Sequence, residues 1–326
     1  MDLQGWPHAE SPFHAGEQAA QQRAGSREKM EAAGRRVVRP AMPEQHRLFF
    51  AQLPFVVVGA VDAADMPWAT VLSGTPGFMQ APDPGHLRIA ARPLADDPLA
   101  HALGAGADIG LLGIELHTRR RNRMNGRIAA EDETGLTVAV EQSFGNCPRY
   151  IQLRHWREAG ADESGTAAAW HGDALDTGAV EALRAADTIF IATHHHDAAS
   201  GHSGGADVSH RGGKPGFVRV DGARTVTFPD FNGNNYFNTV GNLVANPRAG
   251  LLVPDFERGG LLHLSGHSEI VWEGPEVERF DGAERLVRLH VERVVRRSGV
   301  LPLRWQFEAM SPWVAQTGSW EAAAEH

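Results

Sequence analysis

The hydrophobic pattern of this chain consists of short apolar segments separated by turns. Residues 55–61 form an apolar, valine-rich run, which predicts a buried strand, and residues 68–72 predict the returning strand of a hairpin. Other strands are predicted over residues 87–91, 109–115, 121–130, 136–142, 188–193 and 225–228. Helices are predicted over residues 44–52, 97–103, 178–185 and 236–244. Short strands, frequent turns and few helices favour small barrels.

The chain divides into five segments by this pattern and by composition. A helical arm is expected over residues 1–45, and residues 158–174, rich in Gly, Ala and Ser, are the expected linker. The linker separates a first barrel, residues 46–157, from a second barrel, residues 175–310, and residues 311–326 form a tail. We therefore expect a mainly β protein of the α+β class, with two barrels in tandem.

Three short motifs occur in the same order in both halves of the chain. The pairs are Pro76-Gly77-Phe78 with Pro215-Gly216-Phe217, Gly110-Leu111-Leu112 with Gly250-Leu251-Leu252, and Asn125-Gly126-Arg127 with Ser265-Gly266-His267. The first pair is 139 residues apart (215 − 76), and the other two are 140 residues apart (250 − 110 and 265 − 125). A nearly constant spacing favours a duplicated domain over turn motifs shared by coincidence.

The two copies differ where chemistry is expected. Copy two carries an amide-rich segment, residues 229–239, and copy one, with residues 91–98 in the corresponding place, lacks it. Asn234 and Asn235 precede a predicted helix, where asparagine caps backbone N–H groups that also attract phosphate, and Gly233 lets backbone approach a ligand. The alternative is a well-capped surface loop. The simplest interpretation is one competent site in copy two and one degenerate site in copy one.

Cationic side chains gather at two further places. Arg211 and Lys214 flank two glycines, and form either a phosphate-binding turn or a solvated turn between strands. Arg121 and Arg123 belong to an arginine-rich strand, residues 118–127, whose alternation divides the arginines between two faces. This strand is either a clamp for phosphate or carboxylate or a salt-bridged contact between the halves. A nucleic-acid patch is the weakest of the interpretations.

The bulk composition limits the function classes. The formal net charge is −9, which argues against a dedicated nucleic-acid binder. No apolar run approaches the roughly 20 residues of a membrane span, and the polar N-terminus lacks the apolar core of a secretory signal. Cys147 is the only cysteine, so no intrachain disulfide forms. A cytoplasmic protein that binds neither nucleic acid nor membrane is expected.

The histidine-rich stretch around His194, His195 and His196 is the remaining candidate for a metal or heme site. Neighbouring residues of a strand point to opposite faces, so this spacing suits ligation poorly, and no metal is predicted. Cys147 is interpreted as a small buried thiol rather than a nucleophile, because a nucleophile would need a nearby base and an oriented partner, which the sequence alone does not show.

Taken together, these motifs resemble the pyridoxamine 5'-phosphate oxidase-like, FMN-binding split-barrel superfamily. In copy two the resemblance lies in residues 207–217, in Pro229-Asp230-Phe231 with Gly233-Asn234-Asn235, and in Asn242-Leu243 with residues 246–252. In copy one, residues 11–17, 67–69, 112–115, 118–123 and 145–148 resemble a bacterial branch of that group. The resemblance extends to about Trp305.

The resemblance implies two split barrels that form an intrachain pseudo-dimer, with one FMN at their junction. It implies FMN contacts from Arg211, Lys214, Pro229, Asp230, Phe231, Asn234, Asn235 and Asn242 of copy two, and from Arg121 and Arg123 of copy one. The implied activity is that of an FMN-dependent oxidoreductase acting on a small-molecule substrate or electron donor, with no catalytic residue assigned. A homodimer is left open.

Other functions on the same fold stay open at this point. The chain could bind or store flavin or heme without turnover, or act as a deazaflavin-dependent reductase, or be a cofactor-free relative. A counterpart of the C-terminal arginine and histidine pair that binds substrate in true pyridoxamine phosphate oxidases is not found, so vitamin B6 synthesis is not expected.

Overall fold

The computed structural model describes residues 5–163, 165 and 168–320. The remaining positions of the expected arm, linker and tail (1–4, 164, 166–167 and 321–326) lie outside the described residues. The α-helices are α1 (Ala15–Arg23), α2 (Arg27–Val37), α3 (Glu44–Gln52), α4 (Thr177–Ala185), α5 (Asn238–Ala245), α6 (Pro275–Glu278) and α7 (Pro312–Ala315). Within the described ranges, no helix is both long and apolar enough to cross a membrane.

The strands make up most of the regular structure. In the first half they are β1 (Phe55–Val61), β2 (Pro67–Ser73), β3 (Met79–Asp83), β4 (His86–Ile89), β5 (Asp108–Glu115), β6 (Arg120–Asp132), β7 (Gly135–Gly145) and β8 (Leu153–Glu158). In the second half they are β9 (Trp170–Gly172), β10 (Thr188–His195), β11 (Gly205–Gly212), β12 (Arg219–Asp221), β13 (Thr225–Phe231), β14 (Arg248–Asp255), β15 (Gly260–Val271), β16 (Ala283–Arg297) and β17 (Leu303–Ala309).

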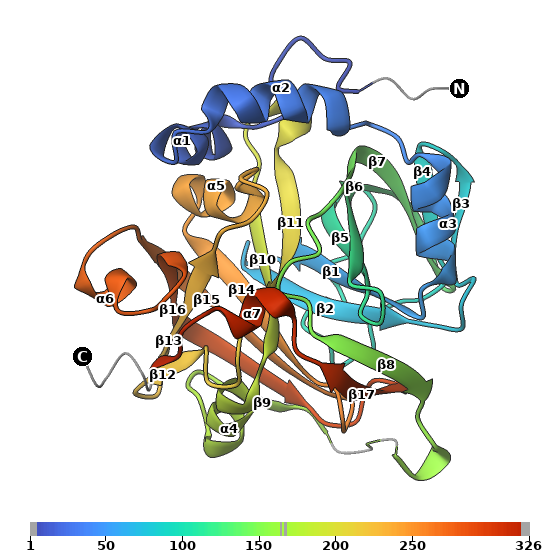
Figure 1. Cartoon of the computed structure of the whole chain (residues 1–326). Helices are drawn as coiled ribbons and strands as arrows, with labels where there is room; N and C mark the ends of the chain where they lie inside the picture. The colour runs from blue at the N-terminus through green and yellow to red at the C-terminus, as the bar shows by residue number, and fades with distance from the viewer. Residues whose placement is uncertain (1–4, 164, 166–167, 321–326) are drawn as a thin grey trace.

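Two large antiparallel sheets share one strand order (Figure 1). The first sheet runs β2-β1-β5-β6-β7-β4-β3, and the second runs β11-β10-β14-β15-β16-β13-β12, with β9 added beside β16. Renaming β1 to β7 as β10 to β16 converts the first order into the second. The mainly β fold of two tandem split barrels that the sequence predicted is thus confirmed.

The repeat extends to a shared irregularity. A bulge shifts the register of β6 against β7 between Asn125 and Gly126, and another shifts β15 against β16 between Ser265 and Gly266. A Cβ atom on Gly126 would lie 1.9 Å from the carbonyl oxygen of Ala139, and one on Gly266 would lie 2.0 Å from a carbonyl of the facing strand. Glycine is therefore required at both bulges, which explains the second residue of this sequence motif.

The two copies pack directly against each other through a second pair of repeated glycines. A Cβ atom on Gly110 in β5 would lie 2.8 Å from the carbonyl oxygen of Ala206 in β11. A Cβ atom on Gly250 in β14 would lie 2.3 Å from the carbonyl oxygen of Pro67 in β2. The contacts are reciprocal. Strand β5 of copy one packs against β11 of copy two, and β14, the counterpart of β5 in copy two, packs against β2, the counterpart of β11 in copy one. This close approach forms the pseudo-dimer within one chain.

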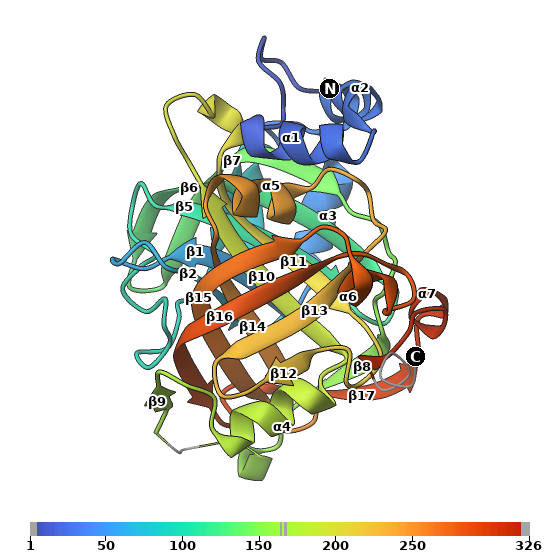
Figure 2. The same ribbon diagram turned by 90° about the vertical axis from the view of Figure 1, so that its left-hand side faces the viewer.

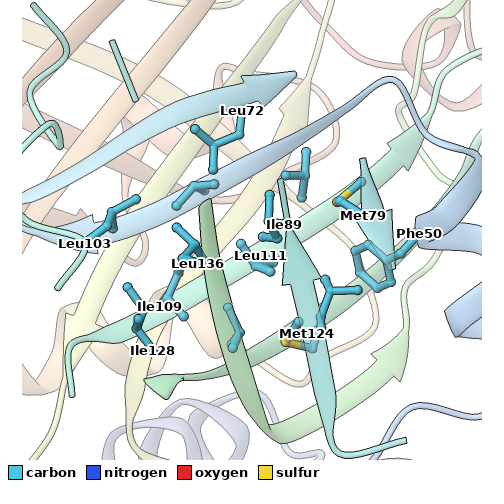
Figure 3. Packing of buried hydrophobic residues seen from close by; sticks show 14 of the residues in the cluster. Phe50, Leu72, Met79, Ile89, Leu103, Ile109, Leu111, Met124, Ile128 and Leu136 are labelled. Carbon is cyan, nitrogen blue, oxygen red and sulfur yellow. The ribbon is translucent and has the colours of Figure 1, made fainter. Parts of the chain in front are cut away.

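Each copy has its own core, and a third core lies between the copies. Figure 3 shows the first core, in which Leu111 of β5, Met124 of β6 and Leu136 of β7 pack together. Along β1, Val56 and Val58 belong to this core, whereas Val57 belongs to the core shared with β10 and β14. Both faces of β1 are therefore buried, which is why its sequence is continuously apolar instead of alternating.

The N-terminal arm lies on copy two through α1, and it also contacts β7 of copy one, where Gln142 donates to the carbonyl oxygen of Pro12 at 3.1 Å. Helices α1 and α2 lie over α5 in both views of the chain (Figures 1 and 2). A Cβ atom on Gly16 would lie 2.2 Å from the carbonyl oxygen of Gly241, and one on Gly241 would lie 2.4 Å from Cγ of Glu17. The close contact of α1 with α5 therefore depends on a glycine in each helix.

The structure differs from the predicted elements at several places; β3 and β9, the latter inside the expected linker, form where no strand was predicted. Residues 97–103 form turns and no helix, because the Asp97 carboxylate accepts a hydrogen bond from the Leu99 N–H and favours a local turn. Helix α5 begins two residues later than predicted, because Asn235 and Phe237 have φ of 60° and 62°. Strand β8, beyond the last strand predicted for the first half, pairs with β17 in a separate two-stranded sheet.

Candidate functional site

A pocket of about 730 Å³, part of it open to solvent, lies where copy one meets copy two. Copy one contributes side chains from β6 and from the segment after β7. Copy two contributes β11, the end of β13, the amide-rich loop, the start of α5 and the start of β16. Arginine and amide side chains make up much of its wall, so the lining suits a polar, anionic ligand.

Seven of the ten residues predicted as a cofactor site line this pocket. They are Arg121, Arg123, Arg211, Asp230, Phe231, Asn234 and Asn235. The other three residues do not line it. Lys214 donates from Nζ to the carbonyl oxygen of Thr317 at 2.5 Å, and Pro229 is buried in β13 opposite Leu286 of β16. Asn242 lies in α5, and its Oδ1 accepts a hydrogen bond from Nε2 of His14 at 2.9 Å, away from the pocket.

Arg121 is the cation with the fewest protein partners in the pocket. Its Nε donates to the carbonyl oxygen of Cys147 at 2.7 Å, and its terminal nitrogens have no hydrogen bond to the described residues. Burial, followed by the nearby Arg123 and Arg211 guanidinium groups, lowers the pKa of Arg121 to about 9. A cation held among other cations favours a bound anion, because the anion relieves their repulsion.

Arg123, two residues along the same strand, has its hydrogen bonds within the protein. Its Nη1 donates to Oδ1 of Asn238 at 2.7 Å, and its Nε lies 3.0 Å from Oδ1 of Asp207. Its Nη2 donates to the Ser209 hydroxyl and to the carbonyl oxygen of Val208. This side chain, only 3% exposed, connects β6 of copy one to β11 and α5 of copy two. Its main role in the structure is to hold the two sides of the pocket together.

Asp230 is shared by two further arginines of the pocket. Its Oδ1 lies 3.1 Å from Nε of Arg211, and its Oδ2 accepts from Nη1 of Arg285 at 2.6 Å. Arg285 also lies against the ring of Phe237, with 4.9 Å from Cζ to the ring centroid. Arg285 was not predicted as a site residue from the sequence. No local motif marks it, and only its place opposite Asp230 in the β13–β16 pairing reveals its role.

The pocket is more positive than the protein that surrounds it. Four guanidinium groups, from Arg121, Arg123, Arg211 and Arg285, line the pocket with two carboxylates, from Asp230 and Glu284. A third carboxylate, Asp207, pairs with Arg123 behind the wall, which leaves a net charge of +1. The whole chain carries −9. The contrast makes the pocket a local attractor for anions in an acidic protein.

The amide-rich loop forms one wall of the pocket and is fixed by its own contacts. Oδ1 of Asn234 accepts a hydrogen bond from the Tyr236 N–H at 3.1 Å. The Phe231 ring stacks on the Tyr150 ring, with 5.1 Å between centroids, and the Tyr150 hydroxyl donates to the carbonyl oxygen of Asn232 at 3.0 Å. The loop therefore brings an aromatic pair beside the arginines without needing a ligand to shape it.

Apart from arginine Nε atoms, two side chains of the pocket have buried polar atoms with no hydrogen-bond partner in the described part of the chain. They are Oδ1 of Asn146 and both ring nitrogens of His210. Burial, together with Arg121, Arg211 and Arg154, lowers the pKa of His210 well below its usual range, so its ring is neutral. Buried polar groups are normally paired. Unpaired groups at a pocket wall are therefore available to a ligand or to ordered water.

The other sequence candidates lie outside this pocket or contribute only backbone. Cys147 is partly buried and supplies the carbonyl oxygen that Arg121 binds. His194 contacts Asp108 of copy one at 2.9 Å, and His196 lies 3.7 Å from the same carboxylate. Neither histidine lines the pocket.

No protein-family model matches the sequence, and neither does any curated protein. Solved structures with a partial likeness include HupZ of Group A Streptococcus, which is 18% identical, with a TM-score of 0.29 and coverage of 42% of this chain and 98% of HupZ. A candidate pyridoxamine 5'-phosphate oxidase of Lactobacillus delbrueckii is 14% identical, with a TM-score of 0.30 and coverage of 38% and 94%. An FAD binding protein from Mycobacterium smegmatis is 17% identical, with a TM-score of 0.27 and coverage of 39% and 98%.

Proposed function

We propose that this chain is a flavoprotein that binds one FMN in the junction pocket and transfers electrons between the flavin and a small molecule. The observation that carries this proposal is a cationic pocket between two barrels, with one arginine, Arg121, whose terminal nitrogens have no hydrogen-bond partner among the residues that the structure describes. The resemblance of the sequence to FMN-binding split barrels identifies the anion that such a pocket would take.

The residues of the pocket fit the chemistry of FMN. Arg121 and Arg211 would hold the phosphate, since a guanidinium group matches two phosphate oxygens. Asn234, Asn235 and Asn146 offer amide groups for the hydroxyls of the ribityl chain. The Tyr150–Phe231 pair offers aromatic surface for the ring system. When bound, FMN supplies the hydride and electron chemistry itself, while the protein determines its binding and access.

Two features of the chain would shape that chemistry. The neutral ring of His210 can donate one hydrogen bond and accept another, so it can orient a ligand without adding charge. Asp230 holds Arg211 and Arg285 in fixed positions, which keeps two cations in the pocket despite their mutual repulsion. No side chain of the pocket is assigned as a general acid or base.

The test is the visible spectrum of the freshly purified full chain, followed by release of the cofactor and its identification by mass. We expect a two-banded flavin spectrum and FMN at about one per chain. A Soret band would show that the bound cofactor is heme and not FMN. A released cofactor with the mass of a deazaflavin would indicate a deazaflavin-dependent reductase. A colourless protein that FMN does not stabilise against melting would contradict the proposal.

A pair of neighbouring arginines provides the matched control. Arg121→Gln should weaken FMN binding about 10- to 100-fold, which is the usual range for one charge-assisted contact. Arg120→Gln removes an exposed cation that lies over the Phe49 ring, and should leave the affinity unchanged. Equal losses in both variants would indicate a long-range charge effect and would exclude a direct contact from Arg121.

A further inference from the structure

We propose that His8, Glu10 and His202 form a binding site for one divalent transition-metal ion, which joins the N-terminal arm to the β10–β11 loop. The site is separate from the junction pocket and does not depend on the proposed flavin. It differs from the sequence-based expectation that the chain holds no metal.

The three side chains already have nearly the spacing of a coordination sphere. One ligand atom from each of them lies within 4.8 Å of the others. Nδ1 of His8 is 4.0 Å from Oε1 of Glu10, and the His8 and His202 rings stack with 4.0 Å between centroids. In a tetrahedral site, metal–ligand bonds of about 2.1 Å place the ligand atoms roughly 3.4 Å from each other. A contraction of up to about 1.4 Å, with a turn of the two stacked rings toward one point, therefore completes the site.

The backbone on both sides of the site is held by contacts that do not involve the ligand atoms. Arg35 donates from Nη1 to the carbonyl oxygen of His8 at 3.2 Å, and Trp6 donates from Nε1 to the carbonyl oxygen of Glu10 at 2.8 Å. On the loop, His202 lies in a 3-10 turn, Gly201–Ser203, which the Ser203 hydroxyl closes on the carbonyl oxygen of Ser200 at 2.7 Å. Only side-chain rotations are needed to bind the ion.

The neighbouring histidines have other partners, which singles out these three residues. His194 and His196 face Asp108, and His195 lies 3.4 Å from Asp197. The His202 ring has a stacking contact with His8 and no hydrogen bond to the described part of the chain. Its nitrogens are therefore available for an ion without breaking an existing bond.

The donor set indicates the class of ion. Two imidazole nitrogens and one carboxylate oxygen suit Zn²⁺, Co²⁺ or Ni²⁺, whereas Mg²⁺ and Ca²⁺ prefer oxygen ligands alone. Three protein ligands leave a fourth position for water. Bound metal would fasten residues 8–10 to residue 202, and through α1 it would hold the arm against α5, whose first turn lines the pocket.

The experiment is a calorimetric titration of the untagged full chain with Zn²⁺. We expect one ion per chain, and at least a tenfold loss of affinity in Glu10→Gln and in His202→Gln. His267→Gln is the matched control, because His267 is an exposed histidine paired with Glu292 at 2.5 Å outside the cluster, and it should bind Zn²⁺ like the parent. Unchanged affinity in both cluster variants, or an equal loss in His267→Gln, would overturn the proposal.

Two further measurements distinguish this site from the adjacent histidines. Co²⁺ should give the visible absorption of a low-coordinate nitrogen and oxygen site in the parent and in His196→Gln, but not in His202→Gln. Zn²⁺ should also slow tryptic cleavage at Arg23 and Arg27, between α1 and α2, in the parent and not in Glu10→Gln. Loss of the Co²⁺ signal in His196→Gln alone would place the ion elsewhere and would overturn the assignment.

Discussion

The junction pocket and its counterpart in copy one occupy equivalent places in the two barrels, yet one is open and the other is filled. The strand register makes Arg121 equivalent to Leu261, and Arg123 equivalent to His263. Because β6 pairs with β7 as β15 pairs with β16, Asn146 is equivalent to Arg297. Each copy thus contributes the same three positions to the site of the other.

Arg297 fills the counterpart site. It is 2% exposed and donates to Oδ2 of Asp97 at 2.7 Å and to Oδ1 of Asp96 at 2.6 Å. Thr70, the equivalent of Ser209, donates to Asp97, and Nδ1 of His263 contacts the carbonyl oxygen of Ala69 at 2.9 Å. The Arg297 cation in copy one's site is therefore neutralised by Asp96 and Asp97, whereas the junction pocket keeps cations that acids do not fully neutralise. In this fold, a junction can bind an anionic ligand only where its cationic side chains are not already paired with acidic residues of the protein.

The largest expected effect comes from opening the filled site. Arg297→Ala should lower the free energy of unfolding by about 3–5 kcal/mol, because it leaves Asp97 buried without its cation. Denaturant titration measures the change. Arg293→Ala, on the same strand, removes an exposed partner of Asp62 and should cost at most about 1 kcal/mol. Similar losses in the two variants would contradict the view that Arg297 fills a site.

The next effect concerns the open pocket. Arg211→Ala should weaken FMN about 10- to 100-fold while leaving riboflavin, which lacks the phosphate, nearly unaffected. The ratio of the two affinities, measured by fluorescence quenching, separates a phosphate contact from general damage to the pocket. If both flavins lose affinity equally, Arg211 supports the ring or the fold instead of the phosphate.

The arm buries one acid against copy two, and this acid should make the stability of the protein depend on pH. Burial, with a smaller contribution from Asp207, raises the pKa of Glu17 from 4.5 to about 8. The folded state therefore holds a proton that the unfolded state releases, so stability falls as pH rises from 4.5 to about 8. Burial lowers the pKa of His14 from 6.5 to about 4. Between these two values the unfolded state binds the extra proton, so this contribution makes the free energy of unfolding rise with pH.

These two contributions oppose each other below pH 6.5, and only that of Glu17 remains above it. We expect the free energy of unfolding to fall by up to about 2 kcal/mol between pH 6.5 and 8. Glu17→Gln should keep the hydrogen bond to Asn238 and remove this decline, because glutamine does not titrate. An unchanged pH profile in Glu17→Gln would show that Glu17 is ionised in the folded protein.

The smallest effect should come from the hydroxyl of Thr70. Thr70→Val removes its hydrogen bond to Asp97 and should lower the free energy of unfolding by about 1 kcal/mol. FMN binding should not change, because Thr70 belongs to the filled site. A change in FMN affinity would show that the two sites are coupled.

The sequence predicted the fold better than it predicted the site. Valine-rich runs and repeated glycines report backbone geometry, so the strands around residue 57 and the duplication could be inferred directly. Arg211 could be predicted because it lies next to two glycines, and Arg121 could be predicted because it lies in an arginine-rich strand whose residues alternate between two faces. Lys214 and Asn242 belong to the same motifs, but their side chains bond to Thr317 and His14, which come from distant parts of the chain.

The residues that were missed have a common cause. Arg285 and Arg297 lie on one long strand, β16, among other arginines, and only the facing strand distinguishes Arg285 from Arg297. Arg285 meets Asp230 of its own barrel, whereas Arg297 enters the other barrel. Such roles depend on contacts between segments far apart in sequence, and no local pattern carries them.

The reciprocal contact of Gly110 and Gly250 has a consequence for how such a molecule can change by mutation. In a symmetric homodimer, every substitution at the contact appears twice, so one junction cannot gain an arginine without the other. Joining the two copies in one chain removes that constraint. Position 297 could become an arginine while position 146 remained an asparagine, and selection could then act on each junction independently.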